Sequence, residues 1–213
     1  MTSTIYIKQY KSPRINENEI LRYAGAHQDD AELKGAVDTI LVRVLPLLSY
    51  KACYTILPVD TTAGVRLGGF DFTSQMLAHR LASSSYVLLF CATVGHGIDR
   101  EISKLGLSSP ADALICNAIG SERVESLCDE LCRSVARAEG LAAERAPRYS
   151  VGYGDLPLTY QKTIFEILKP EGRIGVTLRD SMLMSPSKTV TAFVPLSVSA
   201  EELSDFHRSL SEL

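Results

Sequence analysis

The sequence predicts an α+β fold in which a mixed, partly antiparallel sheet packs against helices. Strand and helix patterns follow one another without the strict alternation that a parallel sheet requires. The near-continuous apolar run Tyr86–Val94, bounded by serines and by Gly95, is typical of a central strand buried on both faces. From Pro110 to about Gly140 apolar residues keep helical spacing, which predicts a long helix. A chain of 213 residues, 46% of them apolar, can bury one core, so we expect a single domain over 1–213.

The N-terminal elements are a short strand and two helices. Apolar residues at alternate positions over 5–7 predict the strand, and Asn16 can cap a short helix over 19–23. Asp29 and Asp30 can begin a longer amphipathic helix, whose apolar residues recur at intervals of three and four. These residues are Leu33, Val37, Ile40, Leu41, Val44 and Leu48.

Two strands and a short helix are expected next. Residues 50–59 are rich in β-forming side chains. Residues 65–72 predict a second strand, with a bend or bulge at Gly68-Gly69. Residues 74–82 predict a short helix.

Gly95-His96-Gly97 lies between the buried strand and a helix expected over about 98–105. It lacks the third glycine of the dinucleotide fingerprint and the Gly-Lys-Ser/Thr of a nucleoside triphosphate loop. We therefore interpret it as a strand-to-helix turn. Asp99 is then a first-turn acid that the helix dipole favours.

The C-terminal third combines a helix, two strands and a terminal helix. Pro157–Leu168 predicts a helix that Gly172 stops. Residues 174–178 and 189–194 predict strands. A final helix over 197–213 could serve dimerisation or docking.

Composition excludes several classes of function. The net charge of −3 and the lack of any Lys or Arg run argue against nucleic-acid binding. The N-terminus has no secretory pattern, and the longest apolar run, Tyr86–Ala92, is too short to span a bilayer. No serine lies in a Gly-x-Ser-x-Gly elbow, which argues against such a hydrolase. We therefore expect a cytoplasmic protein without membrane contact.

The cysteines are odd in number and scattered through apparent core segments, as reduced intracellular thiols are. Cys128 and Cys132 would share a helix face, but the four histidines offer no matching ligand spacing. Buried small hydrophobes are the favoured interpretation, and a metal site is the alternative.

The segment Arg148–Asp155 combines groups that a plain surface linker does not need. The guanidinium of Arg148 fits a carboxylate or phosphate bidentately. Gly152 and Gly154 allow positive φ or close approach to a ligand, and Tyr153 adds an aromatic ring. We interpret this segment as a binding loop for a small molecule that bears a carboxylate.

Glu125 is a second candidate, on the long helix. It shares a face with Asp129 at four-residue spacing, and this face also passes the small residues Ala118, Ser121 and Cys128. An ordinary solvated glutamate is the alternative.

The chain resembles the activation domain of cobalamin-dependent methionine synthase, in particular its short stand-alone form. Arg148, Gly152 and Tyr153 reproduce the Arg-x-x-x-Gly-Tyr motif of that family, and Leu156-Pro157-Leu158 follows as its proline-containing helix start. The pattern Gly-x-x-Leu-x-acid-Ser-x-x-Met-x-Pro is matched by 175–186. The resemblance covers roughly 121–194.

The resemblance implies a site for S-adenosylmethionine. Arg148 would hold the carboxylate of its methionine part, and backbone groups of Ser150 and Gly152 would hydrogen-bond the ligand. Tyr153 would line the pocket, where its ring favours a cation. Glu125 would contact an ammonium or a ribose hydroxyl.

The implied activity is the reactivation of a cobalamin enzyme. Inactive cob(II)alamin is recovered with one electron from a reducing donor and a methyl group from S-adenosylmethionine. The chain shows no corrin-binding histidine motif or electron carrier of its own, so the cobalamin would be carried by a partner methionine synthase or corrinoid protein. The alternatives are a non-catalytic module that binds S-adenosylmethionine or caps a corrinoid protein, and an unrelated carboxylate-binding protein.

Overall fold

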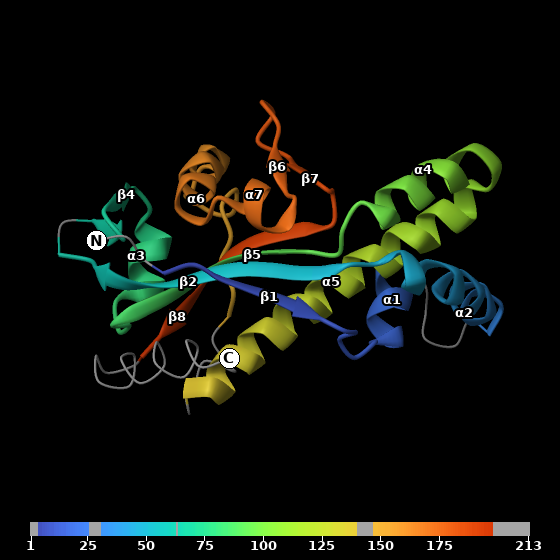
Figure 1. The fold of residues 1–213 in the computed structure, drawn as a ribbon, viewed down its shortest axis with the longest axis horizontal. Helices are drawn as coiled ribbons and strands as arrows, with labels where there is room; N and C mark the ends of the chain where they lie inside the picture. The colour runs from blue at the N-terminus through green and yellow to red at the C-terminus, as the bar shows by residue number, and fades with distance from the viewer. Residues whose placement is uncertain (1–3, 26–30, 63, 140–146, 198–213) are drawn as a thin grey trace.

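The centre of the protein is a six-stranded sheet with the order β4-β3-β2-β5-β8, in which β1 also pairs with β2 (Figure 1). The computed structural model describes residues 4–25, 31–62, 64–139 and 147–197. Every strand pairing in these ranges is antiparallel, so the predicted α+β class is confirmed. The strands are β1 Tyr6–Tyr10, β2 Tyr50–Asp60, β3 Val65–Leu67, β4 Phe70–Phe72, β5 Tyr86–Thr93 and β8 Thr189–Leu196.

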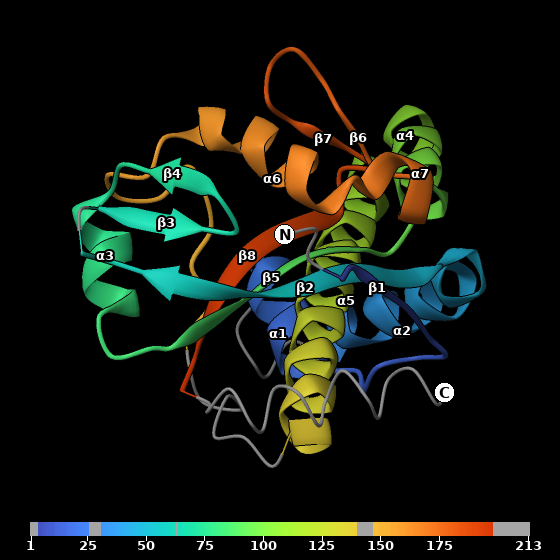
Figure 2. The ribbon, with the colours of Figure 1, turned by 60° about the vertical axis from the view of Figure 1, so that its left-hand side comes forward.

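Helices cover both faces of this sheet. Figures 1 and 2 show α6 and α7 over one face, and α1, α2 and α5 over the other. The small hairpin of β6 (Thr177–Leu178) and β7 (Met184–Ser185) rises on the α6 side. The helices are α1 Glu17–Tyr23, α2 Ala31–Val44, α3 Gln75–Leu81, α4 Gly97–Ser108, α5 Pro110–Glu139, α6 Gln161–Leu168 and α7 Pro170–Ile174.

Strand β5 is apolar throughout because each of its faces borders a different core cluster. Leu88 and Phe90 pack in the cluster that includes α1, α2, α4 and α5. Val87 and Leu89 point the other way, into the cluster that includes α3, α6 and α7. Since side chains alternate along a strand, a continuous apolar run is needed at this position. The predicted central strand is therefore confirmed.

A buried ion pair joins α5 to the N-terminal segment. Arg123 is fully buried and donates through Nε to Glu122 at 2.6 Å. Its Nη atoms donate to the carbonyls of Pro13 (2.8 Å) and Arg14 (2.6 Å), and Glu122 accepts from the amide of Asn16 at 2.9 Å. Removing one partner of such a pair costs about 3–5 kcal/mol, because the other charge is left buried.

The cap predicted at Asn16 is confirmed, and α3 begins with a cap of the same kind. The side chain of Asn16 accepts from the amide of Glu19 and caps α1, and Ser74 caps α3 by accepting from the amide of Leu77. The long helix and the helix after Gly95 are confirmed as α5 and α4. Residues 29 and 30, expected to begin α2, lie outside the described ranges.

The Gly95-His96-Gly97 turn is confirmed as a structural strand-to-helix connection. Gly95 has a φ of 83°, and an added Cβ on Gly97 would lie 2.0 Å from the carbonyl oxygen of Leu47. Asp99 interacts favourably with the helix dipole and also accepts two hydrogen bonds. It accepts from the amide (2.7 Å) and the hydroxyl (2.6 Å) of Ser187, and so fixes the segment between β7 and β8.

Residues 65–72 were expected to form one bent strand, but they form the hairpin of β3 and β4. Gly68 and Gly69 have φ values of 57° and 93°, which suit the two central positions of a tight hairpin turn. The glycines therefore reverse the chain direction and do not bend a single strand.

The helix expected over Pro157–Leu168 is also divided. A 3₁₀ turn at Leu158–Tyr160 precedes α6. Lys169 then adopts left-handed dihedrals (φ 46°, ψ 54°) and ends α6, so Gly172 is not the stop. Gly172 instead lies within α7, which ends at the left-handed Gly175.

The strand expected over 174–178 is mostly wrong. Residue 174 ends α7, and only Thr177–Leu178 form a strand, which pairs with β7 and not with the main sheet. The last strand extends two residues beyond its expected end, to Leu196. The terminal helix expected over 197–213 falls almost entirely outside the described residues.

No helix in the described ranges has both the length and the apolar character needed to cross a bilayer.

Candidate functional site

The loop 147–157 is anchored to the sheet through Tyr149. Its amide donates to the carbonyl of Phe193 on β8 at 2.9 Å, and its carbonyl accepts from the amide of Phe193 at 2.8 Å. The buried Tyr149 hydroxyl also donates to the carbonyl of Tyr153 at 2.8 Å. Since Tyr149 is held inward, its neighbours Arg148 and Ser150 are left half-buried at the surface, next to α5.

The two glycines of the loop are required by its backbone. Gly152 and Gly154 have φ values of 87° and 59°, as the sequence predicts. An added Cβ on Gly154 would lie 2.4 Å from the sulfur of Met76. The amide of Gly152 donates to the carbonyl of Leu156 at 2.8 Å and closes the turn.

Asp155 connects the loop to α3. Its carboxylate accepts from the hydroxyl of Ser74 at 2.5 Å and from the amide of Gln75 at 2.6 Å. The hydroxyl of Ser74 lowers the pKa of Asp155 most, and the amides of Gln75 and Met76 lower it further. Asp155 therefore fixes α3 relative to the loop.

Arg148 forms ion pairs with two carboxylates of α5. Its Nη2 donates to Oε2 of Glu125 at 2.5 Å, and its Nη1 donates to Asp129. Glu125 and Asp129 lie one helical turn apart, so one guanidinium spans both. The side chains of Arg148, Glu125 and Asp129 are 24%, 41% and 59% exposed. The cluster carries two negative charges and one positive charge in contact with solvent.

A pocket of about 660 Å³ opens beside this ion-pair cluster. Its wall comes from α3, α5, the loop and β8, four segments that are far apart in the sequence. Ligand pockets for small molecules commonly have volumes of about 300–1,000 Å³, so this one is large enough. It is lined by Met76, Arg80, Glu125, Asp129, Pro147, Arg148, Tyr149, Ser150, Tyr153, Gly154 and Val190.

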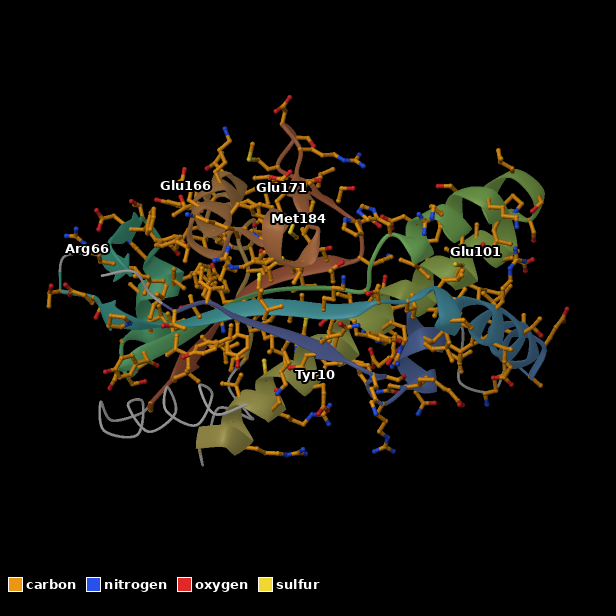
Figure 3. The ribbon with its side chains drawn as sticks, in the orientation of Figure 1. Tyr10, Arg66, Glu101, Glu166, Glu171 and Met184 are labelled. Carbon is orange, nitrogen blue, oxygen red and sulfur yellow. The ribbon has the colours of Figure 1, made fainter. Side chains whose placement is uncertain are left out.

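A second pocket of about 410 Å³ adjoins the first. The two share Glu125, Ser150, Tyr153 and Val190. The second is closed on its far side by the segment from Arg179 to Ser187, which includes β7. Figure 3 shows Met184 of β7 on the face of the sheet that carries α6 and α7.

Gln161 ties the wall of the second pocket to the sheet. Its side-chain oxygen accepts from the hydroxyl of Thr191 on β8 at 3.0 Å, and its nitrogen contacts the sulfur of Met184 at 2.9 Å. Gln161 itself is buried. Asp99 binds Ser187 three residues further along, so the segment from Met184 to Ser187 is held at two points.

The structure brings four of the five predicted site residues to these pockets. Arg148 lines the first pocket, and Glu125, Ser150 and Tyr153 line both. Gly152 lines neither, and its amide is already bonded within the loop. In the described part of the chain, Ser150 makes no hydrogen bond of its own.

Sequence reasoning missed two charged groups of the site. Asp129 was noted only as a neighbour of Glu125 on the helix, although the four-residue spacing is the signal that one arginine can span both. Arg80 gave no local signal. It comes from the last turn of α3, and its guanidinium lies 4.9 Å from the centre of the Tyr149 ring.

All five cysteines are buried and free, which confirms their interpretation as small core residues. Burial raises the pKa of Cys116 and of Cys132 to about 11, and that of Cys128 well above its ordinary value. These thiols are therefore neutral near pH 7. Among the described residues, no group of three or more His, Cys, Asp or Glu side chains could hold a metal ion.

Comparison with known proteins gives one informative result. No protein-family model matches the chain, and no curated protein matches it. Among solved structures it is similar to the MetH reactivation domain bound to AdoHcy, with a TM-score of 0.66 and 15% sequence identity. The alignment covers 98% of this chain and 86% of that one. The chain therefore has the fold that the resemblance of its motifs implies.

Proposed function

We propose that this chain is a stand-alone relative of methionine synthase activation domains and binds S-adenosylmethionine in the pocket beside Arg148. The observation that carries the proposal is the agreement of two independent findings. The fold is that of a domain solved with AdoHcy bound, and the motif residues Arg148 and Tyr153 line one pocket of suitable volume. The first finding rests on backbone shape and the second on sequence and cavity.

The charges of the pocket suit this ligand. The amino-acid end of S-adenosylmethionine carries a carboxylate and an ammonium, and its sulfur is a sulfonium. Glu125 and Asp129 supply carboxylates for the cationic groups, and Arg148 and Arg80 supply guanidinium groups. A pocket with both signs of charge in partly exposed positions fits a zwitterion better than it fits a simple anion.

Each predicted site residue has a role in the proposal. Tyr153, 68% exposed, offers its ring to the sulfonium or the adenine, as cations and aromatic bases favour an aromatic face. Ser150 offers backbone groups, and Glu125 binds the ammonium or a ribose hydroxyl. Gly152 contributes by shaping the turn that presents Tyr153, because its amide is bonded to Leu156.

The proposed activity is the reductive methylation of cob(II)alamin on a partner chain. When bound, S-adenosylmethionine supplies the methyl group, and a separate reducing donor supplies one electron. The role of this chain is positional, since holding a reactant in the productive orientation accelerates a bimolecular transfer. A cobalamin-dependent methionine synthase or a related corrinoid protein is the proposed partner, and the five free thiols agree with a cytoplasmic location.

Two measurements test the proposal in sequence. The first is calorimetric titration of the protein with S-adenosylmethionine and S-adenosylhomocysteine. We expect both ligands to bind. If neither produces heat or a thermal shift, an unrelated carboxylate-binding protein becomes the better interpretation.

The second measurement uses a methionine synthase that lacks its own activation domain and carries cob(II)alamin. When this chain is added together with a reductant and S-adenosylmethionine, methylcobalamin should form. Its formation is measured by absorbance. Binding of the ligand without any methylation would favour the alternative, a non-catalytic module that binds S-adenosylmethionine or caps a corrinoid protein.

A further inference from the structure

Methionine sulfur is concentrated at the two pockets. The sequence holds four methionines, of which Met76, Met182 and Met184 lie in the described ranges. Met76 lines the first pocket, and Met182 and Met184 line the second. Each methionine that the structure describes therefore borders the candidate site.

Met76 contacts the loop with both its backbone and its side chain. Its amide donates to the carboxylate of Asp155 at 3.4 Å. Its sulfur packs against Gly154, where an added Cβ would lie only 2.4 Å from the sulfur. The loop has room for this thioether because residue 154 has no side chain. An atom added to the sulfur would therefore press on the loop or occupy part of the pocket.

Met76 is also the most accessible of the three described methionines. It is 43% exposed, whereas Met182 and Met184 are half-buried. The sulfur of Met184 in addition accepts from Nε2 of Gln161 at 2.9 Å, which engages one of its lone pairs. Since a thioether is oxidised when its sulfur lone pair attacks a hydroperoxide, we expect Met76 to react first.

The cysteines compete poorly for such an oxidant. All five are buried, and burial raises the pKa of the Cys91 and Cys128 thiols well above the ordinary value. The thiolate is the form of cysteine that oxidants attack, and buried neutral thiols supply little of it. Oxidation is therefore directed to the thioethers at the pockets.

We propose that Met76 is a reversible oxidation site whose modification lowers the affinity of the pocket for its ligand. In this reaction the sulfur attacks one oxygen of a hydroperoxide, the O–O bond breaks and an S=O bond forms. With hydrogen peroxide the second oxygen leaves as water, so the sulfur loses two electrons and the peroxide gains them. The effect on ligand affinity rests on the proposed function, whereas the oxidation itself does not.

The sulfoxide changes the wall of the pocket. It turns an apolar, flexible side chain into a polar one, with an oxygen that accepts hydrogen bonds. Because Gly154 lies against the sulfur, the new oxygen either displaces the loop that carries Arg148 and Tyr153 or projects into the cavity. Each outcome disturbs the arrangement that the ligand requires. Enzymatic reduction of the sulfoxide restores the thioether.

Peptide mass spectrometry after treatment with dilute hydrogen peroxide locates the modification. Tryptic cleavage separates the methionines, because Met76 lies in 67–80 and Met182 and Met184 both lie in 180–188. Peptide 67–80 should gain one oxygen roughly threefold or more faster than 180–188, and the cysteines should stay unmodified. Equal rates, faster oxidation of 180–188 or earlier oxidation of a cysteine would refute the assignment.

Calorimetric titration with S-adenosylhomocysteine, before treatment and after removal of the peroxide, tests the consequence. Each protein serves as its own reference. Treatment should weaken binding by the wild type roughly fivefold or more, and binding by Met76→Leu, which has no sulfur at this position, by less than about twofold. Met184→Leu is the matched control and should lose affinity on treatment as the wild type does. The melting temperatures of the untreated variants check that the fold is retained.

Peptide methionine sulfoxide reductases A and B, one for each sulfoxide epimer, give a second test that needs no variant. They should return peptide 67–80 to its original mass and restore the affinity of the treated wild type. Affinity that is not restored with the mass, or an equal loss in Met76→Leu, would refute the role of Met76. If the untreated wild type does not bind S-adenosylhomocysteine, the proposed function fails, and the peptide oxidation rates still decide whether Met76 is the oxidation site.

Discussion

Replacing Arg148 by alanine tests the site most directly, because this side chain joins the loop to α5. The substitution removes two ion pairs whose members are 24%, 41% and 59% exposed. Pairs exposed to this extent contribute about 0.2–1 kcal/mol each, so the free energy of unfolding should fall by roughly 1 kcal/mol. In a domain of this size that lowers the melting temperature by about 2–4 °C.

The effect on ligand affinity should be larger than the effect on stability. Arg148→Ala removes a charge at the pocket and releases Glu125 and Asp129, which then repel each other and lose their orientation. A charge-assisted contact contributes roughly 1.5–3 kcal/mol, which is about 10- to 100-fold in the dissociation constant. Calorimetric titration with S-adenosylhomocysteine at neutral pH measures this change.

A double-mutant cycle with Glu125→Gln shows how Arg148 acts. If Arg148 works by holding Glu125, the two substitutions together should weaken binding by less than the product of their separate effects. Arg133→Ala is the control, since Arg133 pairs with Glu130 on the same helix at similar exposure and outside both pockets. Unchanged affinity in Arg148→Ala, or an equal loss in Arg133→Ala, would refute the site as described.

Three further substitutions test the framework around the pocket. In Gly97→Ala, the new Cβ would lie 2.0 Å from the backbone oxygen of Leu47, so we expect a loss of about 3 kcal/mol or more, seen as a fall in melting temperature of roughly 6–12 °C. Asp155→Asn should destabilise the protein near neutral pH. The difference in stability from the wild type should disappear as the pH falls through the lowered pKa of Asp155, because protonation of the wild-type carboxylate removes the same acceptor. Burial raises the pKa of Tyr10 to about 12, so the neutral phenol stabilises the fold below its ordinary pKa of about 10, and this contribution is lost as the pH rises towards 12. Tyr10→Phe should flatten that alkaline loss in denaturation curves recorded between about pH 9 and 12, and an identical slope in both proteins would contradict the assignment.

The parts of the fold that could be predicted from sequence are those set by local chemistry. Asn16 and Ser74 cap their helices because a side-chain oxygen needs only the amide three residues ahead. The run Tyr86–Val94 predicts a central strand because alternating faces must both be apolar. Gly152 and Gly154 predict positive φ for a similarly local reason.

The errors arose where one signal fits two local structures. Gly68-Gly69 suits a bulge or a hairpin turn, and only the pairing of β3 with β4 distinguishes them. Lys169 has no Gly-like signal for its left-handed conformation, so the stop was assigned to Gly172, although the helix ends at Leu168 as predicted.

The site was predictable only in part, since its contacts join distant segments. The motif located Arg148, Tyr153 and the helix that carries Glu125, but it did not indicate that Arg148 would be bound to two carboxylates. Arg80 enters the pocket because Asp155 fixes α3 against the loop. No sequence pattern records a contact of that kind.

The position of β8 in the sheet affects how the chain matures. β5 emerges from the ribosome well before β8, the strand that completes it on one side, so an apolar edge stays open while α4 to α7 are synthesised. Such an edge is prone to pair with other chains, and nascent molecules would benefit from chaperone protection during this interval. Because Val190 of β8 also forms part of the pocket wall, only a chain that has closed its sheet can present the whole cavity.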